Sequence, residues 1–378
     1  MDEWLPVFAL PNVALDKAIE TALVALVPPQ DPRVTRLRDK HQAFNQFLGR
    51  FSDSFGVRFE PAVILLKADA PKMFFDIGAL SSFRNLIAIS AIVQNRALNM
   101  RHPHNHRAVF GEVFAFYPWM IDEEYQRLRV RTPALMGIHY VGELQGQSSP
   151  ALSRPYVTVS SLDAPILQDL LRRWEHHYGA EKPDWRNVKI FRSLNMAYHA
   201  SLMPALSDAT FLDVGRLICL WVSALEILAH PEKKEVYKED VFDLLDEAHW
   251  EQGVLKERSY AVVSKRTSVE RTLAAWLCDK MYDCRNDFLH GNPVDRNSIR
   301  LPDTNRSIFE YAAPLYRMAL AETLELEFDK PKPSLADPKA CAEYLAARRS
   351  FVDPQRVIED ALLTAVVNPE PPEDEVSP

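Results

Sequence analysis

Residues 268–291 read SVERTLAAWLCDKMYDCRNDFLHG, and this stretch carries the clearest structural signal in the chain. Its apolar residues recur every three or four positions, which is the spacing of one buried helix face. They are Val269, Leu273, Trp276, Leu277, Met281, Cys284 and Phe288. Gly291, Asn292 and Pro293 follow as a stop signal. The stretch therefore predicts a helix over Ser268–His290.

Both ends of this helix carry informative residues. Thr267 and Glu270 have the spacing of a capping box, in which each side chain satisfies a free backbone N–H of the first turn. His290 lies in the last turn, where carbonyl groups carry partial negative charge that favours a protonated imidazole. Arg285 lies five residues earlier, about 140° away around an ideal helix. Either the last turn unwinds at Gly291, or two copies of the chain assemble one site across a two-fold axis.

The segments before and after this helix in the sequence also have apolar residues at helical spacing, and no strand is expected among them. Further helices are predicted over Asp163–Tyr178, Trp185–Met203, Phe211–Ala229, Val241–Trp250 and Ile308–Leu326. Such a succession indicates a helical bundle. The sequence FLDVGRLICLWVSALEILA (211–229) is apolar almost all round and should be its central helix. A carboxylate there is costly unless paired, so we expect Glu226 to bond Arg285 or a nearby donor.

The first 150 residues combine both patterns. We expect helices over Asp16–Val27, Val34–Phe51 and Ala79–Met100, and strands over Val57–Lys67, Val109–Tyr117, Leu128–Arg131 and Met136–Val141. Residues 142–155 combine Gly, Ser and Pro with little periodicity, which indicates a boundary. The predicted fold class is α+β overall: a mixed α/β domain over 1–150, an all-α bundle over 156–330, and a helical extension with a disordered acidic tail over 331–378.

Composition limits the class of protein. The 378 residues are 47% hydrophobic and 25% charged, which is ordinary for a globular chain. The four cysteines form no Cys-x-x-Cys pair, and we find no export signal and no membrane span, so a reduced, cytoplasmic protein is expected. The net charge of -8 argues against indiscriminate nucleic-acid binding. Residues 256–306 are nevertheless locally basic, with ten Lys/Arg against seven Asp/Glu.

A histidine cluster is the one candidate for metal chemistry. His102, His104 and His106 alternate in RHPHNHR, but no Cys or carboxylate completes a zinc set. We therefore expect a solvated loop, no metal site and no cofactor, and a metal hydrolase is disfavoured. Three arginines around the cluster are interpreted as surface charge rather than as contacts to an RNA backbone: Arg96, Arg101 and Arg107.

The segment MYDCRNDFLHG (281–291), preceded by LWVSALEIL (220–228), resembles the Apea-like branch of the HEPN superfamily. The hallmark of that family is an arginine, four residues of which the first is polar, and a histidine. Here these are Arg285, Asn286 and His290, with Tyr282 before them and Gly291 after them. The resemblance covers roughly residues 161–327, and the N-terminal part has no comparably specific match.

The resemblance implies a homodimer in which two such motifs face each other, and RNA cleavage without metal in the active members. His290 would then move a proton at the ribose 2′-hydroxyl or the leaving 5′-oxygen. Arg285 would hold the scissile phosphate, and Asn286 would bond the phosphate or orient His290. DNA would not be cut. Three further residues would support the site from neighbouring positions: Glu226, Tyr282 and Asp287.

Simpler interpretations remain open beside this one. Arg285 could pair with Asp279 or Asp283 while His290 merely ends the helix, and Glu226 could belong to a structural ion pair between helices. The main hypothesis is an endoribonuclease, as a toxin or phage-defence effector whose N-terminal domain senses or restrains. The alternative is a non-catalytic HEPN module that binds a nucleotide, RNA or a regulatory partner protein.

Overall fold

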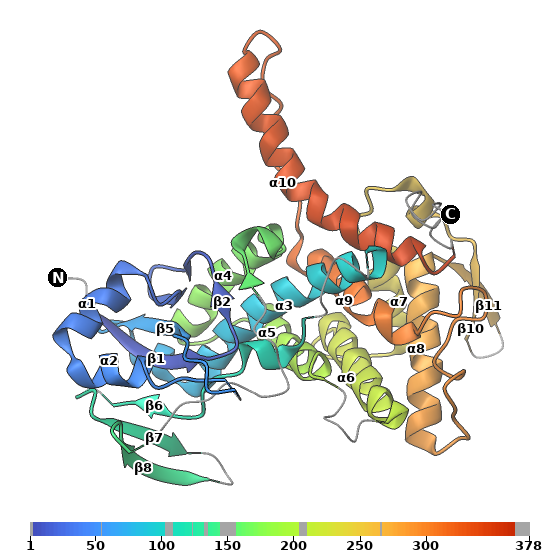
Figure 1. Cartoon of the computed structure of the whole chain (residues 1–378). Helices are drawn as coiled ribbons and strands as arrows, with labels where there is room; N and C mark the ends of the chain where they lie inside the picture. The colour runs from blue at the N-terminus through green and yellow to red at the C-terminus, as the bar shows by residue number, and fades with distance from the viewer. Residues whose placement is uncertain are drawn as a thin grey trace, which may run out of the picture. The chain divides into compact units, whose positions relative to one another are not determined.

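The computed structural model describes residues 3–53, 55–102, 109–122, 124–131, 135–143, 156–203, 210–264 and 267–366. The chain is mixed α and β, as predicted (Figure 1). Its described α-helices are α1 (Pro32–Lys40), α2 (Gln42–Leu48), α3 (Ile77–Arg101), α4 (Ala164–Gly179), α5 (Trp185–Ala200), α6 (Phe211–Ala229), α7 (Lys238–Asp246), α8 (Leu273–His290), α9 (Ile308–Leu324) and α10 (Pro338–Leu363).

The described strands form small sheets. They are β1 (Trp4–Leu10), β2 (Ala14–Leu15), β3 (Ile19–Glu20), β4 (Val24–Val27), β5 (Ala62–Lys67), β6 (Met120–Ile121), β7 (Arg127–Arg131), β8 (Met136–Tyr140), β9 (Tyr156–Val157), β10 (Tyr260–Ser264) and β11 (Thr267–Arg271). The antiparallel sheets have the orders β1-β5-β4-β3, β6-β7-β8 and β10-β11, and β2 pairs with β9 in parallel.

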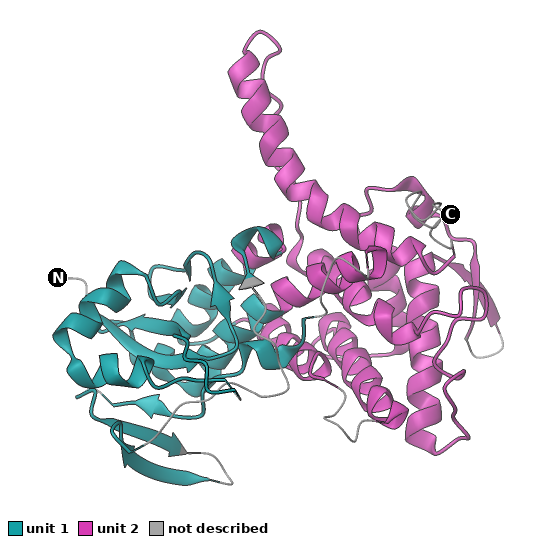
Figure 2. Cartoon of the chain, in the orientation of Figure 1, with its two compact units in different colours: residues 1–88, 109–162, 170–183 teal, residues 89–108, 163–169, 184–378 magenta. Residues whose placement is uncertain are grey.

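The chain divides into two compact units that interleave along the sequence (Figure 2). Unit 1 comprises residues 1–88, 109–162 and 170–183, and unit 2 comprises residues 89–108, 163–169 and 184–378. Helices α3 and α4 each contribute residues to both units. The predicted linker at 142–155 lies almost entirely outside the described residues, and the predicted division into 1–150, 156–330 and 331–378 stays a prediction.

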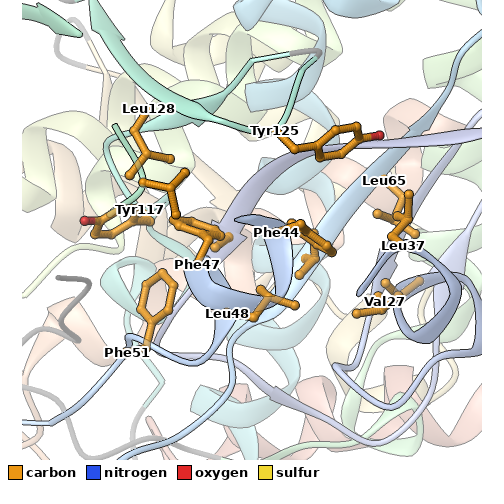
Figure 3. Packing of buried hydrophobic residues seen from close by; sticks show 14 of the residues in the cluster. Val27, Leu37, Phe44, Phe47, Leu48, Phe51, Leu65, Tyr117, Tyr125 and Leu128 are labelled. Atoms are coloured by element: carbon orange, nitrogen blue, oxygen red, sulfur yellow. The ribbon is translucent and has the colours of Figure 1, made fainter. Parts of the chain in front are cut away.

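Unit 1 is built on the β1-β5-β4-β3 sheet. Strands β4 and β5 are buried nearly throughout, which fits their apolar runs, VALV and AVILL, the latter followed by the half-buried Lys67. Side chains of α1 and α2 pack with residues of these strands in one cluster (Figure 3). The predicted helix over Val34–Phe51 is two helices, because His41 adopts an extended conformation and stacks on Tyr125 with ring centres 3.9 Å apart.

Two further predictions for unit 1 were wrong. Residues 16–27 form the hairpin of β3 and β4 rather than a helix, since β4 pairs with β5 over its whole length. This long-range pairing outweighs a local helical spacing. Residues 109–117 contain a 3-10 turn, Gly111–Phe114, instead of a strand. The predictions for 79–100, 128–131 and 136–141 agree with α3, β7 and β8.

Unit 2 is organised around α6, which contacts α5, α7, α8 and α9. Its Trp221 and Leu225 are fully buried. The Ser193 hydroxyl of α5 donates to the Ala224 carbonyl oxygen of α6 at 2.7 Å and lies 2.9 Å from the Tyr316 hydroxyl of α9. A helix that is apolar all round is thus surrounded by other helices, as its composition predicts.

The described strands of unit 2, β10 and β11, were not predicted from the sequence. Residues 267–271 form β11, which pairs with β10, so α8 begins at Leu273 and the predicted capping box of Thr267 and Glu270 is wrong. Thr272 is the actual N-cap, and its hydroxyl accepts from the Ala275 N–H at 3.3 Å. Asp246, at the end of α7, accepts from both the backbone N–H and the hydroxyl of Thr272. A carboxylate from another helix therefore determines where α8 begins.

A buried polar network joins distant parts of unit 2. The Arg317 guanidinium of α9 donates to Asp163 at 2.8 Å and to Gln355 at 3.2 Å. Arg317 and Asp163 have side-chain exposures of 2% and 0%. Gln355 donates in turn to the buried Glu359 at 2.9 Å. Through these bonds the second half of α10 is attached to the bundle.

Helix α3 passes the length and composition test for a membrane span, but 78% of its most apolar window is buried within the folded chain. Burial of this extent is typical of the core helix of a soluble protein. Helix α10 lies within the predicted C-terminal part, residues 331–378, whose predicted acidic tail from residue 367 onward lies outside the described residues. The first buried residue of α10 is Val352, and those between Pro338 and Ser350 include no buried residue. Figure 1 shows the helix labelled α10.

Candidate functional site

The candidate site lies at the C-terminal end of α8, where α8 packs against α6 (Figure 1). Phe288 of α8 lies on Gly215 and beside Phe211, with the two rings 6.2 Å apart. Further back on α8, the Tyr282 hydroxyl reaches Glu226 of α6. The two helices are thus antiparallel, and the last turn of α8 lies beside the first turns of α6.

Gly215 permits this close approach, and sequence reasoning did not single it out. A Cβ atom at Gly215 would lie 2.4–2.5 Å from three ring atoms of Phe288. Glycine inside a helix costs about 1 kcal/mol relative to alanine, so a glycine within an otherwise apolar helical run was the available signal.

Gly215→Ala is expected to lower the free energy of unfolding by about 1–2 kcal/mol, because overpacking at Phe288 exceeds the gain in helix propensity. Chemical denaturation measures this change. Gly253→Ala is the matched control, since a Cβ atom there meets nothing within 4 Å. Equal effects of the two substitutions would contradict the packing role, and Phe288→Leu in the Gly215→Ala background should recover stability.

Arg285 is half-buried beside α6. Its guanidinium donates a weak hydrogen bond of 3.4 Å to the side-chain oxygen of Asn286. Burial raises the pKa of the Cys219 thiol on α6, and the nearby Arg285 charge opposes that rise. Among the described residues, no carboxylate lies within 4.0 Å of the Arg285 guanidinium. The cation therefore keeps donors available to a phosphate.

The acids that could have neutralised Arg285 are engaged elsewhere. Asp279 lies 3.5 Å from the ammonium of Lys238 and 3.7 Å from that of Lys280. Asp283 lies 3.2 Å from Lys280. The simpler interpretation that Arg285 pairs with Asp279 or Asp283 is therefore wrong: both carboxylates face lysines.

His290 and Asn286 are exposed at the same end of α8. The helix continues through His290 and stops at Gly291, which has a left-handed φ of 70° and donates its N–H to the Asp287 carbonyl oxygen. Of the two predicted ways to join Arg285 and His290, unwinding of the last turn is thus not adopted. Asp287 accepts a 2.8 Å hydrogen bond from the Asn292 side chain, so its carboxylate fixes the helix end.

Glu226 is half-buried and accepts a 3.2 Å hydrogen bond from the Tyr282 hydroxyl. Burial, reinforced by the neighbouring Cys278 and Glu226, raises the pKa of the Tyr282 phenol above its usual range. The phenol therefore stays protonated and keeps donating to Glu226. Of the two predicted partners, the nearby donor is the one found, since no ion pair between Glu226 and Arg285 occurs in the described part of the chain.

Of the histidine cluster, only His102 is among the described residues. His104, His106 and Arg107 lie outside the described residues. Arg96 donates to the Ser201 carbonyl oxygen at 3.0 Å, and Arg101 pairs with Asp360 at 3.0 Å. These two arginines thus have structural partners in unit 2. Within the described ranges, no group of three His, Cys, Asp or Glu side chains is arranged to hold a metal ion.

Comparisons with known proteins add no family to this geometry. No protein-family model, curated protein or solved structure matches the chain. The site must therefore be interpreted from its own residues: an unneutralised guanidinium, an exposed imidazole and an amide at one helix end.

Proposed function

We propose that residues 156–330 form an Apea-like HEPN domain and that the chain is a metal-independent endoribonuclease acting as a homodimer in the cytoplasm. The observation that carries this proposal is that Arg285 is not neutralised by a described carboxylate and lies near His290 along the chain. Its guanidinium has no carboxylate within ion-pair distance among the described residues, and it lies on the same helix end as the exposed His290. A guanidinium and an imidazole are together suited to a phosphodiester, once a second copy of the chain brings the two groups to one site.

The proposed reaction uses the ribose 2′-hydroxyl as nucleophile. His290 takes its proton, or a second His290 gives a proton to the leaving 5′-oxygen. Arg285 stabilises the charge that develops on the phosphate, and Asn286 lies beside that guanidinium and orients it. The 2′-oxygen forms a bond to phosphorus while the bond to the 5′-oxygen breaks. The products are a 2′,3′-cyclic phosphate and a 5′-hydroxyl end.

The test is an incubation of the purified full chain with RNA in EDTA. Cleavage should proceed, and a substrate with a single 2′-deoxy position should resist cutting at that position. Matched DNA should stay intact. If the parent protein cuts nothing but binds RNA or a nucleotide, the non-catalytic alternative replaces this proposal. Cleavage that needs added metal would also overturn it.

The proposed dimer uses the end of the α6–α8 pair. An α8 that is helical through His290 keeps Arg285 and His290 on different faces, so a second copy has to complete each site. Leu212 near the start of α6 and Leu289 near the end of α8 are 54% and 57% exposed. Apolar side chains exposed at one end of a helix pair support an interface there.

Leu289→Glu should therefore weaken self-association about tenfold or more, because a buried charge at an interface is costly. Analytical ultracentrifugation measures the dissociation constant. Leu345→Glu is the matched control, since Leu345 is similarly exposed on α10. If both variants associate like the parent, the dimer does not form through this end.

A further inference from the structure

Strands β7 and β8 give unit 1 a sheet with two different faces. Successive side chains of a strand point to opposite faces. Leu128 and Val130 of β7 are buried, and Figure 3 shows Leu128 within the hydrophobic cluster. Arg127 and Arg129 alternate with them and are exposed. The inner face belongs to the core, and the outer face meets solvent.

Strand β8 adds large apolar side chains to this outer face. Tyr140 lies opposite Arg127 in the strand register, and Ile138 lies opposite Arg129. Met136, Ile138 and Tyr140 are 78%, 60% and 53% exposed. Directly opposite residues on one face have Cβ atoms about 5 Å apart, so each arginine has an exposed apolar neighbour. Exposed apolar side chains gathered in this way indicate an interaction surface.

The charged side chains that β7 and β8 themselves place on the outer face are arginines, while the carboxylates of Asp122 and Glu143 at its edge bond the backbone N–H groups of Arg127 and Tyr140. Neither β7 nor β8 contains an acidic residue, although the whole chain carries a net charge of -8. The Arg127 guanidinium lies 5.5 Å from the centre of the Tyr140 ring. Across the described ranges, no carboxylate lies within 4.0 Å of the guanidinium of Arg127 or Arg129. Both cations therefore remain available to an anionic ligand.

We propose that this outer β7–β8 face binds single-stranded RNA. A single strand supplies one phosphate and one unstacked base per nucleotide, which matches the repeated pairing of an arginine with an apolar side chain. Bases within a duplex are covered by their neighbours and cannot lie on Tyr140 or Ile138. The choice of RNA over DNA rests on the proposed function, whereas the face itself suits any single strand.

Fluorescence anisotropy of a labelled, mixed-sequence RNA oligonucleotide tests the proposal. All proteins are full-length and carry His290→Ala, so the RNA stays intact. Arg129→Glu should weaken binding about tenfold or more and reduce the slope of log affinity against log salt by about 1. Tyr140→Ala should weaken binding about fivefold or more through lost base stacking. Arg36→Glu is the matched control, with the same charge change on an exposed residue of α1.

Three results would overturn the proposal. Arg129→Glu and Arg36→Glu could bind equally well, duplex RNA could compete as strongly as a single strand, or a polyglutamate peptide could bind as tightly through Arg129. The last result would assign the face to acidic proteins. Arg129→Gln is a second variant that removes the positive charge without adding a negative one, in case Arg129→Glu misfolds. The thermal unfolding of each variant should match that of the parent.

These experiments measure RNA binding and RNA cleavage separately. If the parent protein cuts RNA and Arg129→Glu binds RNA normally, the nuclease proposal stands and the proposed RNA-binding face is wrong. If RNA binding depends on Arg129 and Tyr140 but the parent protein does not cleave RNA, the proposed RNA-binding face stands and the nuclease proposal is wrong.

Discussion

His290→Ala is expected to lower the rate of RNA cleavage in EDTA by about 10²- to 10⁴-fold, which is the usual contribution of a positioned general acid or base. The imidazole is exposed at the end of α8, so its removal leaves no cavity and should not change the fold. Single-turnover cleavage of a labelled RNA measures the rate. Loss of cleavage with unchanged RNA affinity would assign His290 to the chemical step rather than to binding.

His176→Ala is the matched control for this substitution. His176 is also exposed and also lies in the last turn of a helix, α4, but has no arginine five residues before it. Its replacement should leave cleavage unchanged. Equal rates for His290→Ala and the parent would remove His290 from the reaction. If the chain acts as a toxin, His290→Ala should also relieve growth arrest in cells that express it, while His176→Ala should not.

Arg317→Ala is expected to cause the largest loss of stability, about 3–5 kcal/mol in the free energy of unfolding. The substitution leaves the carboxylate of Asp163 without its cation at a site that solvent does not reach. Asp163 also accepts from the Ile166 N–H at the start of α4, so it cannot move to water without uncapping that helix. Urea denaturation followed by circular dichroism gives the change.

Two further variants make this prediction specific. Arg349→Ala removes an exposed arginine of α10 and should leave the unfolding midpoint unchanged. Asp163→Asn in the Arg317→Ala background removes the unpaired charge, retains a capping oxygen and should recover part of the loss. If the double variant is no more stable than Arg317→Ala, desolvation of Asp163 is not the cause.

The sequence predicted the helices whose signals are local. Helix α6 has the expected bounds, and α8 stops where Gly291 follows His290, because apolar spacing and a left-handed glycine act within a few residues. The mixed α and β character of the chain was predicted for the same reason. The same local signals put Arg285, Asn286 and His290 at this helix end, whereas their role as a site came from the family resemblance and stays a prediction.

Only the tertiary structure decided which local preferences prevail. Residues 24–27 became a strand because β5 pairs with them, and α8 began at Leu273 because Asp246 of α7 holds Thr272. The lysines that engage Asp279 and Asp283 leave Arg285 its donors, and one of them comes from α7. Pairing, capping and charge neutralisation between distant residues depend on distances in space. The periodicity of a local segment does not contain those distances. Such partners therefore cannot be identified from the sequence pattern, because they come together only in the folded chain.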